Sequence, residues 1–160
     1  MPSLTLSDGF AALNRGDLAT AGEACKQALE KDQAQASAHF LVGLVALEGK
    51  QRQVAHQAFK SVLKLDKDHA AAWAHLAKLN VGEGRIAAAE AALKEVRRIQ
   101  PSDPLVIELT GTVLNSLGEY EAAEIFFERA HQMVPKSPSA LMNLGNVRVF
   151  LGKIDDAVHL

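Results

Sequence analysis

The feature that most constrains the fold is a 34-residue period that runs along the 160-residue chain without insertions. One column at this spacing holds alanine in every repeat: Ala21, Ala55, Ala89, Ala123 and Ala157. A second column holds the small residues Gly9, Gly43, Ala77, Gly111 and Gly145. A third column holds larger side chains: Cys25, Phe59, Leu93 and Phe127. Self-similarity at this length predicts one small helical unit stacked several times.

These columns predict pairs of antiparallel helices. A glycine or alanine in the first helix lets the backbone of a second helix approach closely. The third column lies four places after the alanine column, so both share one helical face. Because no segment alternates apolar and polar residues, we expect no strands.

A turn glycine is expected to end the first helix of most repeats in the left-handed conformation. It recurs at Gly16, Gly84, Gly118 and Gly152. In the second repeat the glycine comes one place early, at Gly49, and Lys50 occupies the column. In two later loops, at 101–104 and 135–138, a proline ends one helix and a second proline starts the next.

The spacing predicts where each helix lies. We expect first helices at 3–15, 37–48, 70–82, 105–117 and 139–151. We expect second helices at 18–31, 52–65, 86–99 and 120–134, with a fifth second helix beginning at Ile154.

The columns resemble the tetratricopeptide repeat (TPR), a 34-residue helix–turn–helix unit. The third repeat carries the family pattern at Trp73, Leu76, Ala77, Ala89, Leu93 and Pro101. The fourth carries it at Gly111, Gly118, Tyr120, Ala123, Phe127, Ala130 and Pro135, and the fifth at Leu144, Gly145, Gly152 and Ala157. The first two repeats depart from it: Thr5 and His39 replace the tryptophan, and Gln33 and Lys67 replace the closing proline.

The resemblance implies an all-α fold, a right-handed α-solenoid of antiparallel helix pairs. It implies a single array over 1–160, with repeats at 2–35, 36–69, 70–103 and 104–137 and a partial fifth repeat at 138–160. It also implies an interaction scaffold whose first helices line a concave groove for a partner's peptide or helix.

Family geometry assigns partner contacts to the inward side of the first helices, which is notably apolar in the N-terminal half. The candidate residues are Phe10, Leu13, Phe40, Leu41, Leu44, Leu47, His75, Lys78, Glu108, Leu109, Asn143 and Asn146. Three interpretations of the N-terminal apolar patch stay open. It binds a peptide or helix, it forms a homodimer, or the chain itself covers it.

Composition excludes several functions. Apolar residues make up 48% of the chain, which is enough to bury a core. The net charge of −2 leaves no basic surface for nucleic acid.

No apolar run is long enough to span a membrane, so we expect a cytoplasmic protein without a membrane partner. The single cysteine, Cys25, and six histidines without paired ligand spacing predict no metal site, no cofactor and no enzyme activity.

The last predicted helix has only seven residues, 154–160. We therefore expect the fifth repeat to leave Leu144, Val147, Leu151 and Ile154 partly uncovered, for the rest of a longer protein or for a second copy. This supports an alternative function. The chain would be the substrate-presenting or oligomerising N-terminal region of a larger bacterial enzyme, such as a sulfotransferase or glycosyltransferase.

Overall fold

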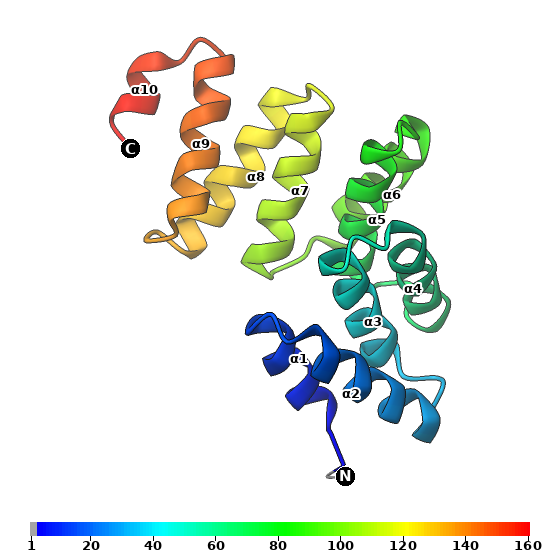
Figure 1. The fold of residues 1–160 in the computed structure, drawn as a ribbon. Helices are drawn as coiled ribbons and strands as arrows, with labels where there is room; N and C mark the ends of the chain where they lie inside the picture. The colour runs from blue at the N-terminus through cyan, green and yellow to red at the C-terminus, as the bar shows by residue number, and fades with distance from the viewer. Residues whose placement is uncertain (1–2) are drawn as a thin grey trace. The chain divides into compact units, whose positions relative to one another are not determined.

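The computed structural model describes residues 3–160, except for the side chains of Ile154 and Asp155, and the regular elements in this part of the chain are helices (Figure 1). The first helices of the repeats are α1 (Leu6–Asn14), α3 (Ala36–Glu48), α5 (Ala70–Gly82), α7 (Pro104–Ser116) and α9 (Pro138–Phe150). The second helices are α2 (Leu18–Lys31), α4 (Arg52–Leu65), α6 (Ile86–Ile99), α8 (Tyr120–Met133) and α10 (Ile154–Val158). The all-α prediction is confirmed. None of the described helices combines the length and the apolar character needed to cross a bilayer.

Helix α1 begins at Leu6, three residues later than the sequence pattern predicts. The reason is a capping box at Thr5. The backbone N–H of Asp8 donates to Thr5 Oγ1 (3.2 Å), and the backbone N–H of Thr5 donates to Asp8 Oδ2 (2.8 Å). These two bonds satisfy donors that the start of a helix leaves free. The hydrogen bonds from Thr5 also lower the pKa of the Asp8 carboxyl.

The two proline loops start helices as predicted. Pro104 and Pro138 each occupy the first turn of a helix, where a missing backbone N–H costs nothing. The residue before each proline is the cap: Asp103 accepts from the backbone N–H of Leu105, and Ser137 accepts from that of Ala140. Sequence alone therefore locates these two helix starts to within one residue.

The turn between the helices of each repeat is left-handed at the predicted column. The backbone φ is 77° at Gly16, 71° at Gly84, 79° at Gly118 and 74° at Gly152. In the second repeat it is Lys50 that has the positive φ, 57°, whereas Gly49 has an ordinary φ of −75°. The left-handed conformation therefore belongs to the position in the turn, and a lysine must adopt it where the glycine comes one place early.

Replacing Lys50 with glycine is expected to raise the free energy of unfolding by about 1 kcal/mol, because a side chain in the left-handed region is strained and glycine is not. Urea unfolding followed by circular dichroism measures the change. The reciprocal control is Gly84→Lys, where an added Cβ would meet no heavy atom within 4 Å, so that only backbone strain acts. Equal stability of Lys50→Gly and the wild type would show that the strain is relieved elsewhere.

The chain divides into two compact units, one ending at Ala72 and the other beginning at Trp73. In the first unit, the small residues of the second column lie where helices touch, as predicted. A Cβ atom on Gly43 would lie 2.5 Å from the ring of Phe59, and one on Gly9 would lie 2.6 Å from Leu41 Cδ2. Neither position has room for a side chain.

The core of the second unit is one cluster of buried residues from α5 to α9. Its members are Ala77, Ala92, Leu93, Val113, Leu114, Ala123, Phe127, Leu144 and Val147. Here too, a Cβ on Gly111 would lie 2.7 Å from the ring of Phe127.

The expectation that Leu144 and Val147 are partly uncovered is wrong. Both are buried in this cluster, because α9 packs along α8 and these two side chains belong to that contact. Leu151 is half-buried, and Ile154 lies outside the described side chains.

Candidate functional site

The apolar candidates of the first unit lie on α1 and α3, which contact each other. Phe10 and Leu13 come from α1, and Phe40, Leu44 and Leu47 come from α3. All five are half-buried. None of them belongs to the large hydrophobic side chains that the described part of the chain exposes.

Leu41 is the sixth apolar candidate of this unit, and the structure corrects its assignment to the groove. Its side chain is completely buried (0% exposed) and fills the space that Gly9 leaves open. Phe40, the neighbouring candidate, packs its ring against Phe59 (centroids 5.7 Å apart) and His69 (4.6 Å). Leu41 therefore belongs to the core, and Phe40 is held in place by other rings.

The candidates of the second unit lie on three first helices. His75 and Lys78 are on α5, Glu108 and Leu109 on α7, and Asn143 and Asn146 on α9. Lys78 and Asn146 are exposed, and the other four are half-buried. Two of the six interact directly, because Asn143 Nδ2 donates to Glu108 Oε1 at 3.0 Å. This bond joins α7 to α9.

The structure also exposes a set of apolar residues that family geometry places on the inward side of the first helices but that are not among the twelve candidates. The exposed fractions are 74% for Leu105, 62% for Met142, 55% for Val149 and 64% for Phe150. On α9, positions 142, 146, 149 and 150 have the i, i+4, i+7, i+8 spacing of a single helix face. The spacing of this uncharged stripe can be read from the sequence, but its exposure to solvent cannot.

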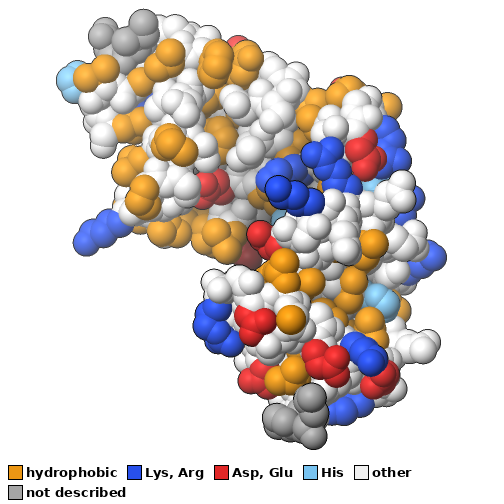
Figure 2. Space-filling model, viewed as in Figure 1, with side chains coloured by type: hydrophobic (Ala, Val, Ile, Leu, Met, Phe, Trp, Pro, Cys, Tyr) orange, Lys and Arg blue, Asp and Glu red, His pale blue; other side chains and the backbone are white. Residues whose placement is uncertain are grey.

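We call this surface the α7–α9 face, and it consists of Leu105, Glu108, Met142, Asn146, Val149 and Phe150. Leu105 and Glu108 are one turn apart on α7, and the Asn143–Glu108 hydrogen bond brings the start of α9, where Met142 lies, close to Glu108. Phe150 stacks flat on Tyr120, with ring centroids 5.1 Å apart and 3° between the planes. Figure 2 shows hydrophobic side chains gathered over α9. The face therefore presents apolar side chains around one exposed amide.

The described part of the chain contains no candidate metal site. No three His, Cys, Asp or Glu side chains there form a set that could hold a metal ion. Burial raises the pKa of the Cys25 thiol to about 11, so the thiol stays protonated at neutral pH and is a poor nucleophile. The arrangement supports contact with another molecule through packing and hydrogen bonds.

Comparison with known proteins identifies the repeat. Residues 46–111 match the family model described as Tetratricopeptide repeat. That model describes a structural repeat and not an enzyme. No curated protein matches the chain.

Solved structures match over almost the whole chain. A thermophilic TPR protein of Thermus thermophilus is 19% identical, with a TM-score of 0.80, over 96% of this chain and 84% of its own. PilF of Pseudomonas aeruginosa is 21% identical, with a TM-score of 0.77, over 94% of this chain and 69% of its own. MamA of Desulfovibrio magneticus RS-1 is 19% identical, with a TM-score of 0.70, over 94% and 85%. At these identities the likeness establishes a shared fold, a helical-repeat solenoid. Residues 46–111 therefore match the tetratricopeptide repeat, and the same 34-residue period continues on both sides of that match.

Proposed function

We propose that this chain is a protein–protein interaction scaffold that binds an apolar peptide or helix of a partner, and that the α7–α9 face makes the central contact. Arrays of stacked helical repeats provide extended surfaces of this kind. The observation that carries the proposal is the exposure of Leu105, Met142, Val149 and Phe150 together on two adjoining first helices.

The chemistry of the face favours a polypeptide partner. Exposed apolar side chains that lie together mark interaction sites, because water contact with them is unfavourable. Asn146 offers both a donor and an acceptor, which suits a peptide backbone. Stacking on Tyr120 holds Phe150 in one orientation, so less conformational entropy is lost when a partner binds.

The other candidate residues are included in the proposal as secondary partner contacts. Leu109 and Asn143 flank the α7–α9 face on its own helices. His75 and Lys78 on α5, and the half-buried Phe10, Leu13, Phe40, Leu44 and Leu47 of the first unit, are proposed as further contacts. Leu41 is withdrawn because it is fully buried.

The proposal predicts that Phe150→Glu weakens peptide binding about tenfold or more, because an exposed aromatic anchor becomes a charge. Peptides selected from a random library on the immobilised wild-type chain are the probes, and fluorescence anisotropy measures their affinity for each variant. The matched control is Ile125→Glu on α8. Ile125 is 66% exposed, close to the 64% of Phe150, but lies outside the α7–α9 face.

Each outcome of this experiment is decisive. The proposal is supported when Phe150→Glu loses binding and Ile125→Glu keeps it, with equal helicity by circular dichroism. Equal binding by both variants would remove the α7–α9 face from the proposal. Analytical ultracentrifugation adds a second test. A wild-type dimer that Phe150→Glu converts to a monomer would make a second copy, rather than a peptide, the occupant.

The alternative function, an arm that presents a protein substrate to an attached sulfotransferase or glycosyltransferase, uses the same face with the substrate as the partner. The cytoplasmic location stays a prediction.

A further inference from the structure

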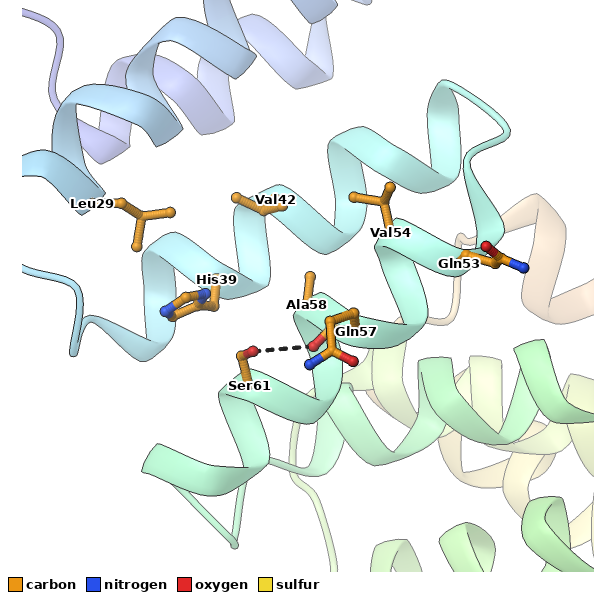
Figure 3. A pocket seen from close by; sticks show the side chains of 8 residues that line it. All are labelled: Leu29, His39, Val42, Gln53, Val54, Gln57, Ala58 and Ser61. Carbon is orange, nitrogen blue, oxygen red and sulfur yellow. Dashed lines mark hydrogen bonds between the residues drawn. The ribbon is translucent and has the colours of Figure 1, made fainter.

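The first unit contains a pocket of about 410 Å³ that shares no residue with the α7–α9 face or with the candidate groove. Residues from three helices line it: Leu29 of α2, His39 and Val42 of α3, and Val54 and Ala58 of α4 (Figure 3). In Figure 3, Leu29 extends from α2 toward α3, and Val54 and Ala58 lie across from it on α4. The volume falls at the lower end of the range of small-molecule sites, about 300–1,000 Å³.

At three lining positions of the pocket, the second repeat has a smaller side chain than one of the later repeats has at the same position. His39 stands 34 residues before Trp73, and Ala58 stands two periods (68 residues) before Phe126. Trp73 and Phe126 are partly buried and pack against the core cluster of the second unit. Val42 similarly stands one period before the larger Leu76, which is buried. At His39 and at Ala58 the second repeat therefore has a smaller side chain than the aromatic residue that one later repeat carries there.

Two of the four polar residues that line the pocket, His39 and Ser61, have side chains that are already hydrogen-bonded within the protein. A ring nitrogen of His39, Nε2, lies 2.9 Å from the backbone oxygen of Gln33, and the hydroxyl of Ser61 donates to the backbone oxygen of Gln57 at 3.1 Å. The remaining lining is aliphatic, apart from two glutamine side chains, and includes no charged residue. An occupant would therefore gain from burying apolar surface, and a charged group would lose its hydration without finding an ion-pair partner.

We propose that this pocket receives one aromatic side chain, an indole or phenyl ring, from a partner polypeptide. A flat ring matches Trp73 and Phe126, the aromatic residues that one later repeat each places at the positions of His39 and Ala58. Rings also bury a large apolar area for few rotatable bonds, which is why aromatic residues so often anchor protein interfaces. The occupant is not the tryptophan of a second copy, because Trp73 is the single tryptophan of the chain and is half-buried in its own fold.

The test is an NMR titration of the ¹⁵N-labelled chain with N-acetyltryptophanamide, which stands for a tryptophan within a peptide. Saturable shifts are expected at the backbone amides of Leu29, Val42 and Ala58. His39→Trp and Ala58→Phe are each expected to weaken binding about tenfold or more, because the new ring fills the pocket. Both variants place a side chain that another repeat carries at that position, so the fold should tolerate them, and each tests the proposal independently of the other.

Two controls make the result specific. Lys60→Trp adds the same side chain to an exposed position of α4 outside the pocket, and its affinity should equal that of the wild type. N-acetylleucinamide, an aliphatic probe, should bind about fivefold more weakly than the tryptophan probe.

Several results would overturn the proposal. These are the absence of saturable shifts, binding that survives in folded His39→Trp and Ala58→Phe, and equal affinity for the leucine probe. Binding of free indole with exclusion of N-acetyltryptophanamide would instead identify a small-molecule site. Concentration-dependent dimers that His39→Trp abolishes would identify a second copy as the occupant. None of these results depends on the α7–α9 face, so this proposal and the proposed function can fail separately.

Discussion

A chain that carries both Gly111→Ala and Phe127→Leu is expected to lose less free energy of unfolding than the two single variants lose in sum. Gly111→Ala alone should cost about 2 kcal/mol, because its Cβ would lie 2.7 Å from the ring of Phe127 and the core must shift. Phe127→Leu alone should cost about 1–2 kcal/mol, because it leaves a cavity in a tightly packed cluster. The pair should then couple favourably by about 1–2 kcal/mol.

The third repeat explains why the double variant is compatible with the fold. There the chain has Ala77 and Leu93 at the same two positions, and both are buried in the same core cluster. The chain thus uses two solutions to one packing problem, glycine against phenylalanine and alanine against leucine. Gly111→Ala places alanine against phenylalanine, and Phe127→Leu places glycine against leucine. The double variant places alanine against leucine, which is the pair found in the third repeat.

Chemical unfolding of the four proteins, followed by circular dichroism, measures the coupling energy. Gly22→Ala is the control. Gly22 lies on α2, an added Cβ there would meet no heavy atom within 4 Å, and alanine has the higher helix propensity. We expect this variant to be equal in stability to the wild type or about 1 kcal/mol more stable. Strict additivity of the Gly111 and Phe127 costs would show that the two residues do not share one space.

Glu124→Gln is expected to lower the free energy of unfolding by about 2 kcal/mol at pH 7, since it breaks an ion-pair cluster whose two central side chains, Glu124 and Arg148, are largely buried. Glu124 Oε1 accepts from Arg148 Nε at 3.1 Å, and Glu124 Oε2 accepts from Lys153 Nζ at 2.6 Å. Arg148 also donates to Glu128 at 2.7 Å. The Arg148 side chain is only 16% exposed, so its charge depends on these partners. The cluster ties α8 to α9 and to the start of α10.

The same cluster makes stability depend on acid pH. Burial by itself would raise the pKa of Glu124, but the hydrogen bonds and charges of Lys153 and Arg148 outweigh it, so the pKa lies below its ordinary value of 4.5. A carboxyl whose pKa is lowered by folding stabilises the protein above the unfolded pKa, and that contribution is lost as the pH falls through the folded pKa. The wild type should therefore lose this contribution only below about pH 4.5.

Thermal unfolding of the wild type and of Glu124→Gln between neutral and acid pH checks this prediction. The difference between the two proteins should be largest at neutral pH and should shrink below the ordinary pKa of a carboxyl, because wild-type Glu124 then becomes neutral as well. Glu121→Gln removes an exposed carboxylate from the same helix and should behave like the wild type at every pH. A difference that stays constant down to strong acid would mean that packing, and not charge, explains the effect.

The helix bounds were predictable because they depend on residues that are close together in the sequence. The bounds of α2, α4, α5 and α6 agree with those expected from the period and from the turn residues. Helix α1 was placed too early because Thr5 and Asp8 form a capping box that the pattern of apolar residues does not register. The turn of the second repeat was ambiguous in sequence, and its geometry follows the column rather than the glycine.

The candidate site was predictable only as a set of helix faces. Periodicity correctly placed Glu108 and Asn143 on neighbouring first helices, where they form a hydrogen bond. The sequence pattern favoured the first unit as the partner-contact surface because Leu41 and Phe40 are apolar. In the structure, however, Leu41 fills the space beside Gly9, and Phe40 packs on other rings. Whether an apolar side chain is buried depends on the size of side chains far away in the sequence. The 34-residue spacing alone does not show which of those side chains pack against it.

By itself, therefore, the sequence determined the repeat, the helix pairs and the positions of the turns, since these follow from contacts between residues close together in the chain. Only the tertiary structure decided which apolar side chains meet water. Exposure of Phe150, burial of Leu41 and the pocket beside His39 all depend on how well side chains from different helices fill the space between them. That filling is a property of three-dimensional packing.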